Sequence, residues 1–178
     1  GWTWFEPTLG YDNARLPEAL LLAGTRCGDA EMVADGLATL AWIDQQQTAP
    51  EGHFRAIGTD SFGAFYEPPL PFDQQPLEAW ATIDANATAL RLTNDLRWAE
   101  MAERAYRWYL GDNDLGMPMA SLDDGGCFDG LMSDRANLNQ GAESILAFQL
   151  ACVAMARLAE VEGRQSGNQQ RQGDAVAT

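Results

Sequence analysis

The sequence predicts an all-α fold built from helical hairpins, and three observations lead to this prediction. Apolar residues recur at helical spacing in five segments, whereas the apolar/polar alternation that is typical of strands is nearly absent. Turn residues separate the segments, and similar polar sequences recur at the starts of the first, third and fifth. The chain has 178 residues, of which 46% are apolar, so one domain with a sizeable core is expected.

The first two helices form one predicted hairpin. The first covers residues 15–25, tolerates Pro17 in its opening turn and is ended by Gly28. The second extends to about residue 47, with Asp29 as its N-cap. Because so few residues separate them, the two helices are expected to pack side by side.

The third and fourth helices repeat this arrangement. The third covers residues 73–93 and carries Pro76 in its first turn. The fourth covers residues 96–110, after the punctuating pair Asn94-Asp95. A second hairpin is therefore predicted.

A fifth helix is predicted over residues 140–162, where Ala, Leu, Phe and Met dominate. Residues 163–178 are rich in Gln, Gly and Arg without periodicity, so we expect a helical domain over residues 1–162 and a disordered tail. The longest apolar stretch, residues 145–156, is shorter than the roughly 18 to 20 residues that span a bilayer. No transmembrane helix is expected.

The odd-numbered helices begin alike. Glu18, Glu78 and Glu143 each follow a polar segment at a helix start, with 60 residues between the first two and 65 between the last two. Such a repeat is typical of stacked helical hairpins, arranged as a solenoid or a closed toroid. The long loops over residues 48–72 and 111–138 both lead into odd helices, so they should gather at one end of the array. Loops of that length tend to be functional.

The charge balance disfavours two classes of partner. Eleven basic residues, all arginines, face 26 acidic ones, and a net charge of −15 repels nucleic-acid phosphates and anionic lipid headgroups. Neither nucleic acid nor a membrane is expected as a partner. The first residues lack an initiator Met and the order of a secretory signal, which indicates a chain cut from a longer one.

No metal or cofactor is predicted. The three cysteines, Cys27, Cys127 and Cys152, have no metal-type spacing, and their odd number favours a reducing, cytoplasmic location. The glycine-rich stretch 125–130 lacks the preceding strand and the following Gly-Lys-Ser/Thr of a phosphate-binding loop, so a tight loop is expected. Acidic neighbours disfavour Cys127 as a nucleophile.

The polar and aromatic residues before and within the first turns of the odd helices are those that sugar-binding sites use. Carboxylates and amides hydrogen-bond sugar hydroxyls, and aromatic rings stack on the apolar faces of pyranoses. The predicted binding residues are Trp4, Glu6, Tyr11, Asn13, Arg15, Phe54, Gln74, Gln75, Glu78, Asn139 and Gln140.

Glycoside hydrolysis requires two carboxyl groups a defined distance apart. Asp73 and Glu143 are the predicted acid/base pair, with Asp12 and His53 assisting. Helix capping is a competing interpretation, because Asp73 and Asn139 stand where N-caps belong and a first-turn Glu stabilises the helix dipole. For His53 the competing interpretation is a packed surface-loop residue. The sequence alone leaves both open.

Five motifs carry a resemblance to a known family. They are Trp4-Phe5-Glu6, Tyr11-Asp12-Asn13-Ala14-Arg15-Leu16-Pro17, Gly52-His53-Phe54, Phe72-Asp73-Gln74-Gln75-Pro76-Leu77-Glu78-Ala79 and Asn137-Leu138-Asn139-Gln140-Gly141-Ala142-Glu143-Ser144. They resemble the six-hairpin glycosidase-like α/α toroids, in particular a bacterial helical domain associated with group-one glycosyltransferases and mannoside-processing genes. The similarity covers residues 2–158.

This resemblance implies a six-hairpin toroid whose sugar site lies where the inner helices begin. The chain would supply about two and a half hairpins, as a C-terminal piece of the barrel. The resemblance assigns no catalytic pair, so the residues named above depend on their position and chemistry.

Three functional hypotheses follow. The first is a carbohydrate-active, glycoside hydrolase-like domain, and the second is a non-catalytic glycan-binding or scaffolding domain of a glycosyltransferase. The third is a sugar epimerase or isomerase with His53 as proton shuttle, which the presence of a single histidine disfavours. The expected partners are a saccharide and either the rest of a longer chain or a second copy that completes the toroid.

Overall fold

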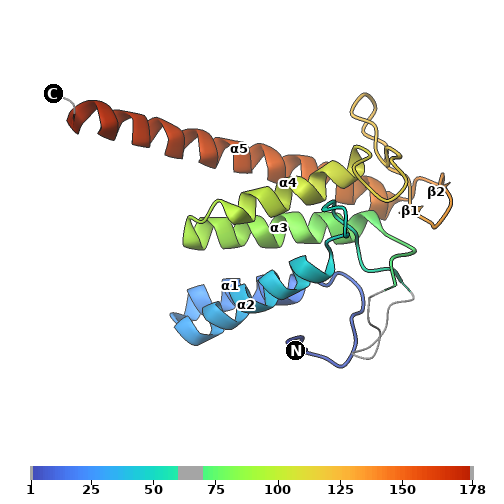
Figure 1. Cartoon of the computed structure of the whole chain (residues 1–178), viewed down its shortest axis with the longest axis horizontal. Helices are drawn as coiled ribbons and strands as arrows, with labels where there is room; N and C mark the ends of the chain where they lie inside the picture. The colour runs from blue at the N-terminus through green and yellow to red at the C-terminus, as the bar shows by residue number, and fades with distance from the viewer. Residues whose placement is uncertain (1, 60–69, 177–178) are drawn as a thin grey trace.

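The chain is a mostly helical small domain in a computed structural model, which describes residues 2–59 and 70–176, with side chains to residue 160 (Figure 1). Five helices pack together beside one tiny two-stranded hairpin in these residues. The elements are α1 (Arg15–Cys27), α2 (Ala30–Gln46), α3 (Pro76–Thr93), α4 (Arg97–Tyr109), β1 (Gly130–Leu131), β2 (Ala136–Asn137) and α5 (Ala142–Val176).

Both predicted hairpins are confirmed. α1 packs against α2 and α3 against α4, and the central helix α3 also contacts α1 on one side and α5 on the other. The turn between α1 and α2 forms as expected. Gly28 takes the left-handed conformation at φ 71° and ends α1, and the Asp29 side chain accepts a hydrogen bond from Met32 N at 3.0 Å.

Two predicted helix starts are wrong. α3 begins at Pro76 with Gln75 as its N-cap, so Asp73 precedes the helix and does not cap it. α5 begins at Ala142, and Asn139 likewise lies before the helix. Capping therefore does not explain why Asp73 and Asn139 occur at these positions.

The far end of α5 also differs from the prediction. The helix continues to Val176, past the end expected at residue 162. The division of the chain into a domain over residues 1–162 and a disordered tail stays a prediction.

α3 forms the centre of the core. Every residue from Pro76 to Leu90 except Trp80 and Asp84 is buried, and many of them are alanines. A helix that is buried nearly all round must contact neighbours on several sides, and small side chains allow those neighbours to approach closely. Large side chains from the flanking helices, including Leu21, Trp98 and Phe148, complete the core.

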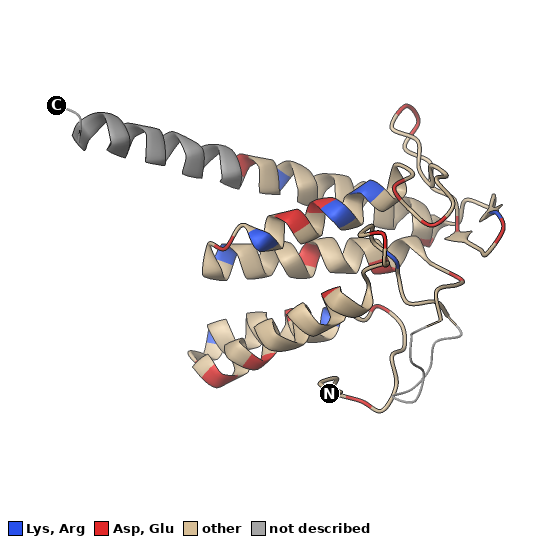
Figure 2. Cartoon of the chain, viewed as in Figure 1, with Lys and Arg blue, Asp and Glu red and all other residues tan. Residues whose placement is uncertain are grey.

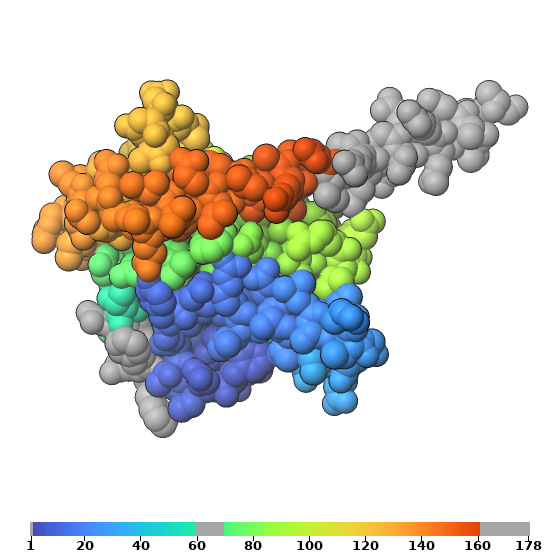
Figure 3. Space-filling model, turned by 180° about the vertical axis from the view of Figure 1, so that it is seen from behind, coloured from blue at the N-terminus to red at the C-terminus, as the bar shows by residue number. Residues whose placement is uncertain are grey.

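The loops between hairpins gather at the end of the array where α1, α3 and α5 begin, as predicted (Figure 1). We call this the loop end. Gln74 joins it to the small sheet, because its backbone exchanges hydrogen bonds with Leu131 at 2.9 and 2.8 Å. Gly125 N donates to Ser121 O at 2.9 Å and closes a turn over residues 121–125, just before the stretch 125–130 that was predicted as a tight loop. This turn projects from the surface in Figure 3.

α5 presents an apolar stripe that the described residues do not cover. Leu146, Leu150 and Val153 are 58%, 41% and 45% exposed, and their spacing places them on one face. The segment Ala142–Glu160 is also long and apolar enough, by length and composition alone, to cross a membrane, so the expectation of no transmembrane helix stays a prediction. Core helices meet the same criterion, and α5 packs against α3 and α4.

Gly58 lies where two parts of the long loop before α3 approach closely. A Cβ at Gly58 would lie 2.0 Å from the Phe72 carbonyl oxygen, whereas a Cβ at Gly10 would contact nothing within 4 Å. We expect Gly58→Ala to lower the free energy of unfolding by about 2 kcal/mol or more, measured by urea denaturation. Gly10→Ala is the matched control, and equal effects of the two substitutions would contradict the close approach.

Candidate functional site

The loop end holds three clusters of polar side chains. We name them after the carboxylate at the centre of each: the Asp114 cluster, the Glu78 cluster and the Asp129 cluster. Each joins segments that are distant in the sequence.

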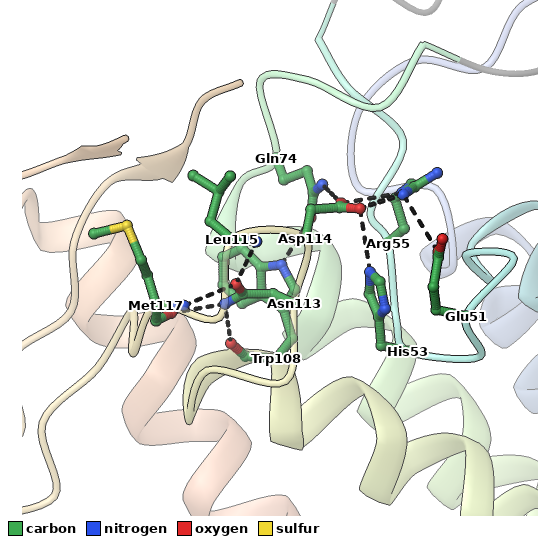
Figure 4. A network of polar contacts seen from close by, with 9 residues as sticks. All are labelled: Glu51, His53, Arg55, Gln74, Trp108, Asn113, Asp114, Leu115 and Met117. Atoms are coloured by element: carbon green, nitrogen blue, oxygen red, sulfur yellow. Dashed lines mark hydrogen bonds and ion pairs between the residues drawn. The ribbon is translucent and has the colours of Figure 1, made fainter. Parts of the chain in front are cut away.

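The Asp114 cluster links the loop after α2 to the segment before α3 (Figure 4). The Asp114 carboxylate accepts hydrogen bonds from Arg55 Nε at 2.8 Å and Gln74 Nε2 at 2.5 Å, and lies 3.2 Å from His53 Nε2. Its side chain is only 8% exposed. Burial pushes the pKa of Asp114 up, but the hydrogen bonds from Arg55, Gln74 and His53 outweigh burial and hold the pKa below its ordinary value.

A second layer of contacts fixes the turn that carries Asp114. Trp108 Nε1 donates to Gln74 Oε1 at 2.8 Å, so both ends of that amide are bonded to protein. Asn113 donates to the carbonyls of Trp108 and Met117 at 2.9 and 2.8 Å and accepts from Leu115 N at 3.2 Å. The cluster is therefore anchored to the end of α4.

His53 was predicted as an assisting catalytic residue, and the structure gives it a carboxylate partner. A carboxylate that orients an imidazole is a feature of general-base sites. Asp114 also forms an ion pair with Arg55, however, so much of its charge is already compensated. Sequence reasoning missed Asp114, because nothing local distinguishes it from other acidic loop residues.

The Glu78 cluster ties the N-terminal segment to α3. Glu78, which is 3% exposed, accepts hydrogen bonds from the backbone of Asp12 at 2.5 Å and from the Asn13 side chain at 3.1 Å. Asp12 has a left-handed φ of 57°, which turns both donors toward the carboxylate. Burial raises the pKa of Glu78 to about 7, although these hydrogen bonds act in the opposite direction.

Tyr11 connects this cluster to α5. Its hydroxyl donates to Glu143 Oε1 at 2.5 Å, and both side chains are exposed. Burial and the neighbouring Glu143 raise the pKa of Tyr11 above its ordinary value, so the phenol stays a donor. Arg15, the first residue of α1, is engaged elsewhere, since its guanidinium bonds Glu18 and Asp84 at 2.7 and 2.8 Å.

The Asp129 cluster organises the start of α5. Asp129 accepts hydrogen bonds from Gly141 N at 2.6 Å and from the Asn139 side chain. Burial raises the pKa of Asp129, but hydrogen bonds from Asn139, Gly141 and Ser144 outweigh it and lower that pKa. The Asp73 carboxylate lies against the next residue, Gly130, where a Cβ would be 2.7 Å from Asp73 Oδ1. Asp73 is thus close to the segment that leads to Glu143.

The predicted site residues fall into three groups by exposure. Those exposed at the loop end are Glu6, Tyr11, Asn139, Gln140 and Glu143. Those half-buried are Asp12, Arg15, His53, Asp73 and Gln75. Those buried are Trp4, Asn13, Phe54, Gln74 and Glu78.

The predicted aromatic platform does not lie on the surface. Trp4 is 7% exposed and stacks on Trp42 with ring centroids 6.0 Å apart, and Phe54 is fully buried. Both belong to the hydrophobic core, because their segments fold back over the helices. Neither ring offers an open face to a sugar in this structure.

Cys127 does not have the properties of a nucleophile. It is buried, and burial together with Asp129 raises the pKa of its thiol to about 12, so the thiol is protonated at neutral pH. No group of three or more His, Cys, Asp or Glu side chains within residues 2–59 and 70–160 could hold a metal ion.

Comparison with known proteins adds no assignment. No protein-family model matches the chain, and a search of curated proteins finds no relative. The resemblance to six-hairpin glycosidase-like toroids therefore stays a prediction.

The buried Glu78 makes stability depend on pH. Its folded-state pKa of about 7 lies above the ordinary 4.5, so its contribution is complete below pH 4.5 and is lost as pH rises toward 7. We expect wild type to lose up to about 3 kcal/mol of unfolding free energy relative to Glu78→Gln over this interval, measured by denaturant unfolding. A difference that is constant with pH would contradict the buried acid. Glu100→Gln, in the first turn of α4, is the exposed control.

Removing the charge of Asp114 should loosen the loop end. Asp114→Asn leaves Arg55 with only its 3.9 Å contact to the exposed Glu51, and we expect a loss of about 2 kcal/mol in unfolding free energy. Asp112→Asn is the control, because its carboxylate is 50% exposed and its contact with Arg107 is 3.6 Å long. Equal losses in the two variants would show that the Asp114 cluster contributes no special stability.

Proposed function

We propose that the chain is a carbohydrate-active, glycoside hydrolase-like domain that binds an oligosaccharide at the loop end. The proposal depends on the 2.5 Å hydrogen bond from the Tyr11 hydroxyl to Glu143. This bond joins exposed polar side chains near the starts of α1 and α5. Asn139 and Gln140 are also exposed, just before the start of α5. These acids, amides and a phenol match the hydrogen-bonding needs of sugar hydroxyls.

Asp73 and Glu143 are the proposed acid/base pair. Asp73 does not cap α3, and Glu143 accepts a hydrogen bond from a phenol. Glu143 is exposed, where a sugar can reach it directly, and Asp73 is half-buried, so we assign Glu143 as base or nucleophile and Asp73 as acid. We assign positioning roles to His53 and Asp12, because His53 contacts Asp114 and the Asp12 backbone N–H donates to Glu78.

The helix arrangement supports the further proposal of a partial toroid. α1, α3 and α5 would be inner helices, with α2 and α4 outside them. The two inner helices at the ends of the array carry exposed leucines, among them Leu16 and Leu22 on α1 and Leu146 on α5. Further helices of a longer chain, or a second copy, would cover these apolar side chains in a closed ring.

A non-catalytic glycan-binding domain of a glycosyltransferase is the second candidate. A general acid works best with a pKa near the working pH. Glu78 has such a pKa, but its carboxylate is buried and bonded to the backbone of Asp12. In this alternative the exposed residues bind a saccharide, and no competent acid reaches the glycosidic bond.

Calorimetry and product chromatography with a panel of mannosides and glucosides test the proposal. We expect Asp73→Asn and Glu143→Gln to lower turnover at least about 100-fold while Asp73→Asn still binds. Glu103→Gln, an exposed change on the outer helix α4, is the control and should leave both quantities unchanged. Binding without turnover in wild type would support the second candidate, and the absence of both would overturn the assignment.

A further inference from the structure

A cavity of about 450 Å³ lies between the outer helices α2 and α4, and none of the predicted site residues lines it. Its size is within the range of small-molecule sites. The lining residues are Ala41, Asp44, Gln45, Thr48, Arg97, Trp98, Met101 and Arg104.

Asp44 brings a buried carboxylate to this cavity. The residue is 3% exposed, and Asn86 Nδ2 donates to its Oδ1 at 3.2 Å. Asp44 Oδ2 is buried and has no hydrogen-bond partner among the described residues. Such atoms are uncommon because burying an unsatisfied charged oxygen is costly, so Asp44 Oδ2 calls for a donor from outside the chain. Burial raises the pKa of Asp44 to about 6, although Asn86 and the charge of Arg104 act in the opposite direction.

Two arginines from α4 bring positive charge to the same cavity. Arg104 is half-buried, and its Nε has no hydrogen-bond partner among the described residues. The charge of Asp44 acts on this guanidinium, but the two side chains form no direct hydrogen bond through Arg104 Nε or Asp44 Oδ2. Arg97 bonds Asp95 at 3.0 Å and lies 4.3 Å from the Trp98 ring centroid. Figure 2 shows basic residues along α4, although the net charge of the chain is −15.

We propose that this cavity binds a small organic acid with a hydroxyl or ammonium donor beside its carboxylate. The ligand carboxylate would pair with Arg104, and the donor would bond Asp44 Oδ2. Trp98 and Met101 supply an apolar wall for the carbon skeleton. Sugar acids and amino acids share this chemistry.

Simpler ions meet only half of these requirements. An inorganic anion would satisfy Arg104 but would be repelled by the carboxylate of Asp44. A cation would satisfy Asp44 but would leave Arg104 unpaired. The two atoms without a hydrogen-bond partner, Asp44 Oδ2 and Arg104 Nε, together therefore favour a ligand that carries both an acid and a donor.

The test is calorimetry on the full chain at pH 7. D-glucuronate and L-serine are the two probes, with D-glucose, acetate and inorganic phosphate as comparators that lack the carboxylate or the donor. We expect one of the probes to bind at least about tenfold more tightly than every comparator. Equal binding of a probe and acetate, or no heat from either probe at millimolar concentration, would overturn the proposal.

Single substitutions test whether the probe binds in this cavity. Arg104→Gln and Asp44→Asn should each lower the affinity for the probe at least about tenfold. Met101→Trp should block binding by filling the cavity. Arg107→Gln, half-exposed on the same helix, is the matched control and should bind like wild type. Circular dichroism checks folding, and if Asp44→Asn does not fold, Arg104→Gln and Met101→Trp decide. Weakening by Glu143→Gln but not by Arg104→Gln would assign the binding to the loop end and overturn the cavity site.

Discussion

The carboxylate of Asp114 is the contact on which the geometry of the loop end depends. It gathers His53 and Arg55 from the loop after α2 and Gln74 from the segment before α3. Because Gln74 is also paired with Leu131, the same contact extends to the small sheet and the loop that leads to α5. Long loops thereby gain fixed positions, which a binding site requires of the residues that it presents.

Some carboxylates at the loop end hold segments of the chain together, whereas others are exposed to solvent. Glu78, Asp114 and Asp129 are engaged by backbone or side-chain donors and hold segments together. Glu143 is exposed and accepts a hydrogen bond from the Tyr11 hydroxyl. The acidic composition is thus partly structural, and only some of the acids that the sequence contains are available to a ligand.

Helical periodicity and turn residues predicted both hairpins and the loop end, because these features are local. Gly28 and Asp29 end one helix and begin the next through contacts within a few residues. The site depended on contacts that the sequence does not reveal. Asp129 lies 12 residues before Gly141 and Asp114 lies 59 residues after Arg55, so no local pattern marked either carboxylate. The prediction of an exposed aromatic platform was wrong for a related reason, because Trp4 and Phe54 pack in the hydrophobic core.

We propose that a saccharide binds at the loop end. Hydrogen exchange of the full chain, with and without a bound manno- or gluco-oligosaccharide, tests it most directly because it reports position independently of turnover. We expect slower exchange at residues 10–13 and 137–144, where Tyr11, Asn139 and Glu143 lie. Protection confined to α2 and α4, or no protection at a saturating concentration, would contradict it.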